Sequence, residues 1–556
     1  MRRRKSRVGL CLLLIALILA AFFYQSRRSA GTVFIAVPAL KPLSEFATLQ
    51  WEPREVELPP PGDDGLRHPG YTLALEHCAT CHLLPEPGQL PRETWPFVMT
   101  WMSNYLGYTN TYVPFGNNVD WALFPGAPLV TEGQLQQMTE YFSIYAPPLE
   151  SFVLRSGESR APSGRFGAKA FPVSLPAGDL VTCVEFDEVG GRLFVGRGNR
   201  PRLQVFGREG EVVWNHYTDS EPVGVETTGT GLRIGLMGAF MEDRERGAIV
   251  DLTPGPQQAL AREPLVEDFH RLTGFQSIDL DQDGEKDLLV VGFGAGVRGR
   301  VSIFWSVEKE QMEERETVLM DYAGGLNAVV KDVDGDGDPD VILATSQQQQ
   351  EILAFRNEGE RRLDQRVLFK GPPGFGMNHI ALADMNRDGR EDIVVTNGNN
   401  MEIKDAPLKP YHGVRILENR GELRFTERYF YPMFGALKTA VADFDRDGDL
   451  DLASIAFYPN WEAENPETFV YLENRGDEGF VPSGLPRENL GRWMCLDVAD
   501  VNGDDFPDVL LGGAYIVQGV HSQQREWFSE WARSRPSLLY LENEGVAGPE
   551  SSEVER

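Results

Sequence analysis

A nine-residue phrase rich in carboxylates recurs along the second half of the chain. Its fullest copy runs from Asp332 to Asp340, with Asp at positions 1, 3, 5 and 9 and Gly337 at position 6. Calcium binds six to eight oxygens, and a tight turn can direct alternate carboxylates at one point when a glycine permits the sharp bend. The backbone carbonyl at position 7 would add one more ligand. This spacing predicts a calcium loop.

Four further copies keep this spacing, and apolar residues typical of strands follow each loop. An EF-hand would instead carry a Glu at position 12 and a helix on each side. A single acidic phrase fits a solvated surface turn equally well, but five copies at near-regular spacing favour calcium. The fifth copy departs from the pattern with Asp505 in place of the glycine. The predicted ligands are the side chains of Asp279, Asp281, Asp283, Asp287, Asp332, Asp334, Asp336, Asp340, Asp384, Asn386, Asp388, Asp392, Asp443, Asp445, Asp447, Asp451, Asp500, Asn502, Asp504 and Asp508.

A second chemical centre is the run Cys78-Ala-Thr-Cys81-His82. A Cys-x-x-Cys-His run is the attachment signature of c-type haem, in which both thiols bond to the porphyrin and the histidine ligates the iron. A redox-active cysteine pair is the main alternative, but it is expected in a βαβ setting that the flanking sequence lacks. Zinc would need a second pair of ligands nearby. The run therefore predicts one covalent haem c.

The sixth position of the iron decides between electron transfer and chemistry at the metal. Met102, near the end of a helix expected over 91–106, is the favoured ligand, and Met99 one turn earlier is the alternative, with a histidine or an open site after them. Thr131 to Gln134 is a capping box that opens a further helix. Met138 falls on the apolar face of that helix, so we expect it in the core.

Helices are expected near 70–83, 91–106 and 131–145, around the haem motif. With the attachment run and the terminal helix, this stretch resembles a small class I cytochrome c domain over residues 69–148. The resemblance implies an all-α domain with a covalently bound haem.

The N-terminus predicts export from the cytoplasm. Five basic residues precede an apolar run from Val8 to Tyr24, and only Arg27 and Arg28 follow it. This asymmetry leaves the N-terminus in the cytoplasm. Since no good cleavage site follows, an uncleaved signal anchor over 1–28 is favoured over a cleaved signal peptide. Residues 29–68, rich in proline and mixed charge, read as a linker.

Overall composition excludes some functions. The chain has 556 residues, a formal net charge of −30, 57 Gly and 37 Pro. This length allows two or three domains, and the glycine and proline content indicates many turns. Much of the negative charge falls in the acidic loops, which favours bound cations. No basic stripe occurs beyond the N-terminus, so we expect no nucleic-acid partner.

From residue 165 to residue 546 the sequence predicts an all-β repeat. Each acidic loop stands between two short strands, and the loops recur about every 50–60 residues, the length of one four-stranded propeller blade. Two earlier blades without acidic loops are expected around 182–194 and 224–250, which gives seven blades in all. Closure into a ring removes exposed sheet edges. Residues 547–556 are expected to be a disordered tail.

The phrases Val441 to Leu452 and Ile380 to Gly389 carry a family resemblance. They resemble the FG-GAP/VCBS repeat propellers related to the head of integrin α-chains, here joined to a cytochrome c domain as in many bacterial exported proteins. The resemblance implies that the loops bind calcium at the rim of the propeller and that the ions are structural, bracing the strand turns.

The innermost strands, which lead into the acidic loops, should line the axial channel. The polar cluster there could be a binding pocket, or it could be hydrogen-bonded channel wall. Cys183 falls in the first blade and Cys495 in the last, which ring closure makes neighbours, so a disulfide and two unpaired buried thiols are both open. The residues expected near the channel are Asn327, Asn378, His379, Lys438, Trp493 and Cys495.

These features predict a protein anchored in a bacterial inner membrane, with most of the chain in the periplasm. We expect an electron-transfer cytochrome whose calcium-braced propeller docks a redox partner protein of the membrane or periplasm. One alternative is an oxidoreductase that binds its substrate in the propeller channel and passes electrons to haem c. Another is a calcium-dependent adhesion or ligand-binding protein with a haem sensor domain.

Overall fold

The computed structural model describes most of the chain from residue 62 to residue 545, with three short strands before it. The predicted membrane helix at 8–24 and tail at 547–556 lie outside the described residues, as does Cys81. Among the described residues, every helix is too short or too polar to span a bilayer. The residues not described after 62 and before 545 are 81, 111–123, 150–161, 170, 172, 174, 230, 241–244, 254–259, 262–263, 295–297, 307–315, 348 and 401–405.

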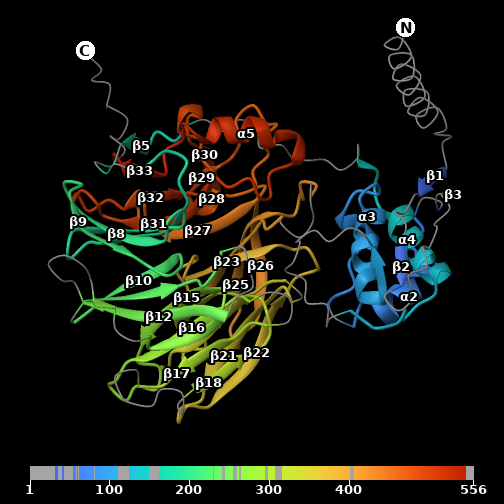
Figure 1. Cartoon of the computed structure of the whole chain (residues 1–556), viewed down its shortest axis with the longest axis horizontal. Coiled ribbons are helices and arrows are strands. Elements are labelled where there is room, and N and C mark those ends of the chain that lie inside the picture. Colours follow the sequence, from blue (N-terminus) through green and yellow to red (C-terminus); the bar gives the residue numbers. More distant parts are fainter. Residues whose placement is uncertain are drawn as a thin grey trace, which may run out of the picture. The chain divides into compact units, whose positions relative to one another are not determined.

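The chain divides into two compact units. The first comprises 1–80, 84–113 and 121–153, and the second comprises 154–556 with the short segments 81–83 and 114–120. Both units appear in Figure 1, and each is described by itself.

The described residues of the first unit form three α-helices near the expected positions. They are α2 (Pro69–His77), α3 (Trp95–Met102) and α4 (Glu132–Tyr145), with 3-10 turns at η1 (Pro87–Gln89) and η2 (Ser103–Leu106). The unit is not all-α as expected, because β1 (Thr32–Ile35) pairs with β3 (Arg54–Glu57) and β2 (Leu40–Pro42) pairs with β4 (Tyr108–Asn110). Three of these strands lie in the stretch 29–68 that was predicted as a linker.

Capping explains where these helices begin and end. Thr131 Oγ1 accepts the N–H of Gln134 while Gln134 Oε1 accepts the N–H of Thr131, which confirms the capping box. Helix α2 ends at His77, earlier than expected, and the Thr80 hydroxyl donates to the His77 carbonyl that the helix end leaves without an intrahelical partner.

The core of this unit is aromatic and apolar. Trp95 of α3 stacks on Phe142 of α4 with ring centroids 4.4 Å apart. Met138 is fully buried in the same cluster, as the sequence predicted.

The second unit is a seven-bladed β-propeller within its described residues. Seven antiparallel sheets follow one another along the chain, and in five of them four strands pair in sequence order from the inside outward. The second blade has a fifth strand, because β13 and β14 both pair with β12. The two early blades predicted around 182–194 and 224–250 are confirmed. The strands of the first three blades are β6 (Val181–Asp187), β7 (Arg192–Arg197), β8 (Arg202–Gly207), β9 (Val212–Tyr217); β10 (Pro222–Thr228), β11 (Gly231–Leu236), β12 (Glu245–Thr253), β13 (Leu260–Ala261), β14 (Val266–His270); and β15 (Leu272–Ile278), β16 (Asp287–Gly292), β17 (Val301–Phe304), β18 (Glu316–Met320).

The remaining four blades are regular, and the last one closes the ring. Their strands are β19 (Gly325–Lys331), β20 (Asp340–Thr345), β21 (Glu351–Asn357), β22 (Leu363–Lys370); β23 (Met377–Ala383), β24 (Asp392–Asn397), β25 (Gly413–Asn419), β26 (Phe425–Pro432); β27 (Ala436–Ala442), β28 (Asp451–Ala456), β29 (Phe469–Asn474), β30 (Phe480–Gly484); and β31 (Trp493–Ala499), β32 (Asp508–Gly513), β33 (Leu538–Asn543) with β5 (Phe166–Lys169).

Strand β5 comes from the start of the propeller but is the outer strand of the last blade. Phe166 pairs with Asn543 and Lys169 with Tyr540, and β5 lies beside β33 in Figure 1. The first strand of each blade packs against the first strands of both neighbouring blades, including β31 against β6. The ring is therefore closed, and no inner edge is left for another chain to pair with.

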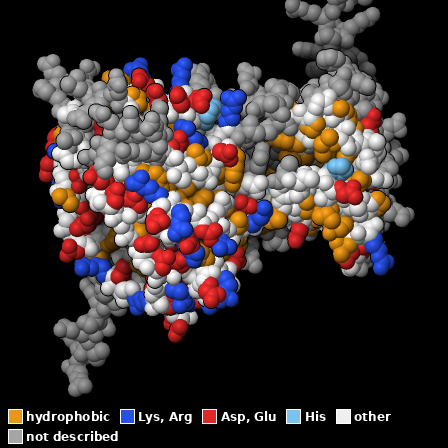
Figure 2. Space-filling view, turned by 90° about the horizontal axis from the view of Figure 1, so that it is seen from below, with side chains coloured by type: hydrophobic (Ala, Val, Ile, Leu, Met, Phe, Trp, Pro, Cys, Tyr) orange, Lys and Arg blue, Asp and Glu red, His pale blue; other side chains and the backbone are white. Residues whose placement is uncertain are grey.

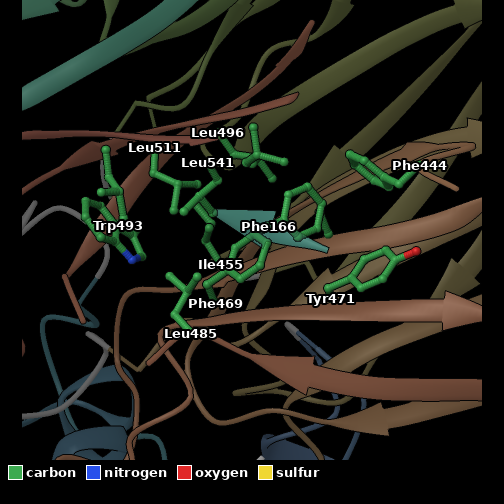
Figure 3. Packing of buried hydrophobic residues seen from close by; sticks show 13 residues of the cluster. Phe166, Phe444, Ile455, Phe469, Tyr471, Leu485, Trp493, Leu496, Leu511 and Leu541 are labelled. Atoms are coloured by element: carbon green, nitrogen blue, oxygen red, sulfur yellow. The ribbon is translucent and has the colours of Figure 1, made fainter. Parts of the chain in front are cut away.

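Apolar side chains between blades form the core of the propeller. The second strands, such as β16, β20, β24, β28 and β32, are buried along their whole length. Figure 3 shows Phe166 of β5 among Phe444, Phe469 and Tyr471, whose ring centroids lie 5.3–6.0 Å from its own. Trp493 is buried in the same cluster. The closing strand is thus fixed by its side chain as well as by its backbone.

Charges of both signs cover the propeller surface. In Figure 2 acidic side chains are interspersed with Lys and Arg over the visible face of the propeller, and that face has no basic stripe. This agrees with the interspersed charges in the sequence.

Candidate metal and haem sites

All five acidic loops join the first strand of a blade to its second strand. They follow β15, β19, β23, β27 and β31, and the ninth residue of each loop is the first residue of the next strand. Because these connections are equivalent in every blade, the loops share one rim of the propeller. The sequence prediction that strands flank each loop is confirmed.

The first aspartate of each loop closes the turn. Its Oδ2 accepts the backbone N–H of position 6 at 2.7–3.0 Å in every copy, from Gly284, Gly337, Gly389, Gly448 and Asp505. The other oxygen, Oδ1, is buried in Asp279 and Asp443 and has no hydrogen-bond partner among the described residues. Burying such an oxygen is costly unless a cation or donor satisfies it. These two loops present an oxygen suited to an ion.

Three loops gather carboxylate oxygens within reach of a single ion. In each of them, one oxygen from each of three aspartates lies within 4.8 Å of the others. The other two loops have Asn386 and Asn502 at position 3, where the amide offers a neutral oxygen. The three groups are Asp279, Asp281 and Asp287; Asp332, Asp334 and Asp336; and Asp443, Asp445 and Asp451.

The ninth aspartate has a role that the sequence did not reveal. One carboxylate oxygen accepts the N–H of position 2 of its own loop, and the other accepts an N–H from the end of the third strand or just beyond it. The residue is buried in all five copies. Burial raises the pKa of these carboxyls, to about 6 in Asp340 and Asp392 and to about 7 in Asp451. Position 9 therefore fastens the loop to its blade in addition to offering oxygens to an ion.

An arginine accompanies each loop that has an aspartate at position 3. Arg361 Nε lies 2.6 Å from Asp281, Arg356 lies 3.6 Å from Asp334, and Arg165 lies 3.4 Å from Asp445. The loops with Asn386 and Asn502 have no charge at this position to pair. Counting only the side chains at positions 1, 3, 5 and 9, each arginine brings its loop to the formal charge of −3 that the two asparagine-containing loops have.

The fifth loop keeps the turn despite its missing glycine. Asp505 has a left-handed backbone with φ of 68°, and the glycines at this position have φ between 84° and 97°. Its N–H still reaches Asp500 at 2.9 Å. An aspartate in this conformation costs about 1–2 kcal/mol relative to glycine, but the oxygens stay in place.

Position 4 links neighbouring loops, a feature missed from the sequence. Its backbone is left-handed in every loop, with φ between 57° and 84°. Where position 4 carries a side chain, it contacts position 7 of another loop: Gln282 donates to Asp338 at 3.0 Å, Arg387 pairs with Asp449 at 2.9 Å, and the guanidinium of Arg446 lies 5.1 Å from the ring centroid of Phe506. In the sequence, the signal for these contacts was a residue other than glycine at position 4 of a loop.

The described residues of the haem motif differ in exposure. Cys78 is half-buried at the C-terminal end of α2 and packs against the core of the first unit. His82 is half-buried, and its Nδ1 donates to the Leu83 carbonyl at 2.8 Å. Since a carbonyl only accepts, the neutral imidazole carries its lone pair on Nε2, and burial lowers the pKa of the ring. This is the tautomer that a metal-binding histidine needs.

The two methionines proposed for the sixth position also differ. Met99 is buried in the apolar core of the first unit with 2% of its surface exposed. Met102, the last residue of α3, is half-buried. Met102 is therefore the more available of the two, and both remain predictions as iron ligands.

The residues predicted to line the channel lie on the first strands of the blades, but several of them form contacts with the neighbouring blade. Asn327 exchanges two hydrogen bonds with the backbone of Ile380 at 3.0 and 3.1 Å. Asn378 donates to the Ala436 carbonyl at 2.7 Å. Trp493 is completely buried in the core between blades, so the expectation that it lines the channel is wrong.

Cys183 and Cys495 lie on the neighbouring first strands β6 and β31. Both are buried free thiols, and Cys495 Sγ lies 3.5 Å from the Val181 carbonyl. Burial raises the pKa of both, to about 12 for Cys495. Of the two alternatives, the structure contains the unpaired thiols.

Three acidic residues of the inner ring were missed from the sequence. Each is the fifth residue of a first strand and accepts a backbone N–H from the next blade: Asp497 from Phe186, Glu185 from Val225 and Glu226 from Ser277, at 2.8–3.1 Å. Burial, with Asp497 and Glu226 nearby, raises the pKa of Glu185 to about 8. In the sequence, the signal for these three residues was a polar residue at the fifth position of a first strand.

His379 and Lys438 lie on the adjacent first strands β23 and β27. Nδ1 of His379 is buried without a hydrogen-bond partner in the described part of the chain. Burial, and then the charge of Lys438, lower the pKa of His379 to about 3. The imidazole is therefore neutral at ordinary pH and keeps an unused ring nitrogen.

Two stretches of the chain, 279–343 and 332–395, match the model of the FG-GAP-like repeat. The chain carries FG-GAP repeats. The matches span the first three acidic loops and their flanking strands. By its sheet topology, the unit that carries these repeats is a seven-bladed propeller within its described residues.

Cartilage acidic protein 1 of Xenopus tropicalis is 25% identical to the chain over 197 residues. The match covers 30% of this chain and 28% of that protein, so the chain spans less than a third of this relative's length.

Solved propellers resemble the FG-GAP propeller in fold alone. Sqt1 of Saccharomyces cerevisiae has a TM-score of 0.41 and 8% identity over 70% of this chain and 100% of its own. The N-terminal domain of Nup159 has a TM-score of 0.40 and 12% identity over 69% and 98%. The WD40 propeller domain of Doa1 has a TM-score of 0.40 and 9% identity over 68% and 96%.

Proposed function

We propose that this protein is an exported, membrane-anchored c-type cytochrome with an electron-transfer role, and that its FG-GAP propeller is a calcium-braced docking module. The observation that carries the proposal is the Cys78-x-x-Cys81-His82 run with the His82 Nδ1–H bound to a backbone carbonyl. Cys78 and Cys81 would hold the porphyrin covalently, and His82 would be an iron ligand with Met102 as the sixth. A bound haem would supply a one-electron redox centre.

The chain's own residues prepare His82 for this role. The bond from Nδ1 to the Leu83 carbonyl fixes both the ring orientation and the tautomer. Because burial lowers the pKa of the ring, the neutral form persists at neutral pH.

The five loops support calcium as the brace of the docking module. They offer grouped carboxylates and, in two loops, a buried carboxylate oxygen without a donor. Oxygen-only donor sets suit a hard cation such as calcium. Calcium would hold the rim loops rigid, so that the propeller presents a fixed surface to a redox partner.

The test is a reduced-minus-oxidised visible spectrum of the exported protein made with a cytochrome c maturation system. We expect a low-spin haem c spectrum that is lost in Cys78→Ala and that loses its sixth ligand in Met102→Ala. Met99→Ala is the matched control on the same helix and should keep the sixth ligand. A parent protein without covalent haem would refute the proposal.

A second candidate function, an oxidoreductase with its substrate in the propeller channel, has one observation in its favour. His379 keeps an unpartnered ring nitrogen beside the positive charge of Lys438, and such a pair could bind an acidic substrate. His379→Ala and Lys438→Ala would abolish turnover of a channel substrate. If both variants keep every redox activity of the parent, this candidate is discarded.

A further inference from the structure

A groove lined by three tryptophans lies on the propeller near α5 (Arg525–Ala532). Helix α5, labelled in Figure 1, belongs to the long connection between β32 and β33 of the last blade. Trp461 reaches the groove from the connection between β28 and β29 of the sixth blade. The groove has a volume of about 460 Å³, within the range of small-molecule sites.

The indole rings form one continuous apolar wall. Trp527 and Trp531 are four residues apart on α5 and stack at 19°, with centroids 5.7 Å apart. Trp461 meets Trp531 at 64° and 5.1 Å, and Trp527 at 60° and 6.0 Å. Trp527 is 47% exposed. A large apolar ring left in water, within a cluster of such rings, marks a surface that binds something.

Buried residues beneath α5 support this wall of indole rings. Phe528, next to Trp527, is completely buried and packs with Tyr515, Val520 and Ala532. The exposure of Trp527 is therefore not the result of a loosely packed helix.

A buried arginine fixes the connection that carries α5. Arg492 is completely buried and donates to the carbonyls of Phe457, Ile516 and Gln518. Its guanidinium lies 3.7 Å from the ring centroid of Phe457 and 5.4 Å from that of Phe528. These contacts tie the sixth-blade and last-blade connections together, so Trp461 and α5 keep a constant spacing.

The rim of the groove offers both donors and acceptors. Arg487, Glu488 and Arg535 line it with the tryptophans. The guanidinium of Arg535 lies 5.0 Å from the ring centroid of Trp531, and its Nη1 donates to the Glu488 carbonyl at 3.3 Å. A guanidinium has five N–H donors, so Arg535 can still donate to a ligand.

We infer that this groove binds a β-1,4-linked oligosaccharide. In cello-, chito- and xylo-oligosaccharides the ring hydroxyls are equatorial, so each sugar has a flat C–H face that suits an indole and polar edges that both donate and accept. The exposed ring of Trp527 would stack on one such face, while Arg535 and Glu488 would bond to the hydroxyls.

The ring geometry disfavours two other occupants. A quaternary ammonium would need aromatic faces set around a void, but Trp461 and Trp531 are in direct edge-to-face contact. A flat aromatic ligand has no slot between two indoles, because Trp527 and Trp531 already stack on each other, and on the open face of Trp527 it would leave the charged rim without hydrogen-bond partners. The inference is independent of the haem, and it goes beyond the proposed electron-transfer function by assigning a ligand to the propeller itself.

The test is titration of the full-length, calcium-loaded protein with cellohexaose, chitohexaose and xylohexaose, followed by tryptophan fluorescence and calorimetry. We expect saturable binding of at least one of them, with affinity at least tenfold lower in Trp527→Ala and in Arg535→Met. Tyr217→Ala removes an exposed aromatic of the first blade and should bind like the parent.

Absence of saturable binding for all three oligosaccharides would overturn the inference. So would binding that is unchanged in Trp527→Ala, because the sugar would then lie elsewhere. Since Trp527 is exposed, this variant should fold normally, and circular dichroism of the variant checks that it does. Saturable binding of a planar aromatic probe such as menadione, with none of the sugars, would also overturn it.

Discussion

The role of each aspartate in an acidic loop depends on its position in the loop. Position 5 is exposed and close to solvent, as in Asp447. Position 9 is buried and bonded to the backbone at both oxygens, as in Asp451, which also accepts the hydroxyl of Tyr471. Each acidic loop thus contains carboxylates that would bind an ion and one carboxylate that stabilises the fold.

This division predicts different effects of two substitutions in the fourth loop. Asp451→Ala leaves three buried donors without an acceptor, so it should lower the free energy of unfolding by about 3 kcal/mol or more even when calcium is removed. Asp447→Ala should change that free energy by less than about 0.5 kcal/mol in EDTA. It should nevertheless lose part of the stabilisation that calcium gives.

Urea unfolding of both variants, with EDTA and with calcium, separates the two roles. Equal losses in EDTA would show that position 9 has no structural role of its own.

Buried charge in the inner ring should make stability depend on pH. The pKa of Glu185 is raised to about 8 by burial and by its acidic neighbours, and Lys438 opposes the shift. The folded protein therefore holds a proton that the unfolded chain releases above about 4.3. The stability from this group is fully present below that pH and is lost as pH rises through 8.

Glu185→Gln removes this dependence and keeps an oxygen for the Val225 N–H. Relative to the parent, the variant should gain stability as pH rises from 5 to 9. Urea midpoints at four pH values in excess calcium provide the measurement, and parallel pH profiles for the two proteins would contradict the assignment.

Among the elements, the short strand β5 closes the last blade of the propeller. Its four residues complete the last blade, and Phe166 inserts among three aromatic rings. A short outer strand held only by its backbone would fray, since half of its groups face water. The side chain of Phe166 is what joins the start of the propeller to its end.

Phe166→Ala should therefore lower the free energy of unfolding of the propeller by about 3–5 kcal/mol. Lys169→Ala, on the same strand, removes only an exposed ion pair with Glu542 and should cost less than about 1 kcal/mol. Denaturation followed by tryptophan fluorescence compares the two. Similar losses would show that backbone pairing alone closes the ring.

At the scale of the whole molecule, the acidic loops lie along one rim and contact each other through position 4. The formal net charge of −30 repels itself in the absence of bound cations. Calcium would offset both the local and the overall repulsion.

Removal of calcium should accordingly lower the thermal midpoint of the propeller. Each site at a hundredfold excess of calcium over its dissociation constant adds about 2.7 kcal/mol. Calorimetry with calcium and with EDTA measures the change, and magnesium should restore little because it prefers a smaller octahedral site. The same midpoint in both buffers would contradict calcium binding by the loops.

The sequence by itself determined the features that depend on local spacing. Alternate aspartates with a glycine are enough to predict the loops. Short apolar strands at a near-constant period are enough to predict the blades and their number, because the blades repeat the same local pattern of strands. The capping box at Thr131 and the buried Met138 also follow from spacing within one helix. The Cys-x-x-Cys-His run belongs to the same class of signal, and haem binding remains a prediction.

Only the tertiary structure decided which groups from distant parts of the chain meet. Phe166 reaches the last blade, Arg361 reaches the first loop, and Asp497 bonds to Phe186 because the ring closes. Trp493 was expected to line the channel, yet it lies between blades. The side chains of a strand alternate between its two faces, and the sequence does not show which set of them faces the channel. The tryptophan groove arises in the same way, from the connections of two consecutive blades that pack against each other.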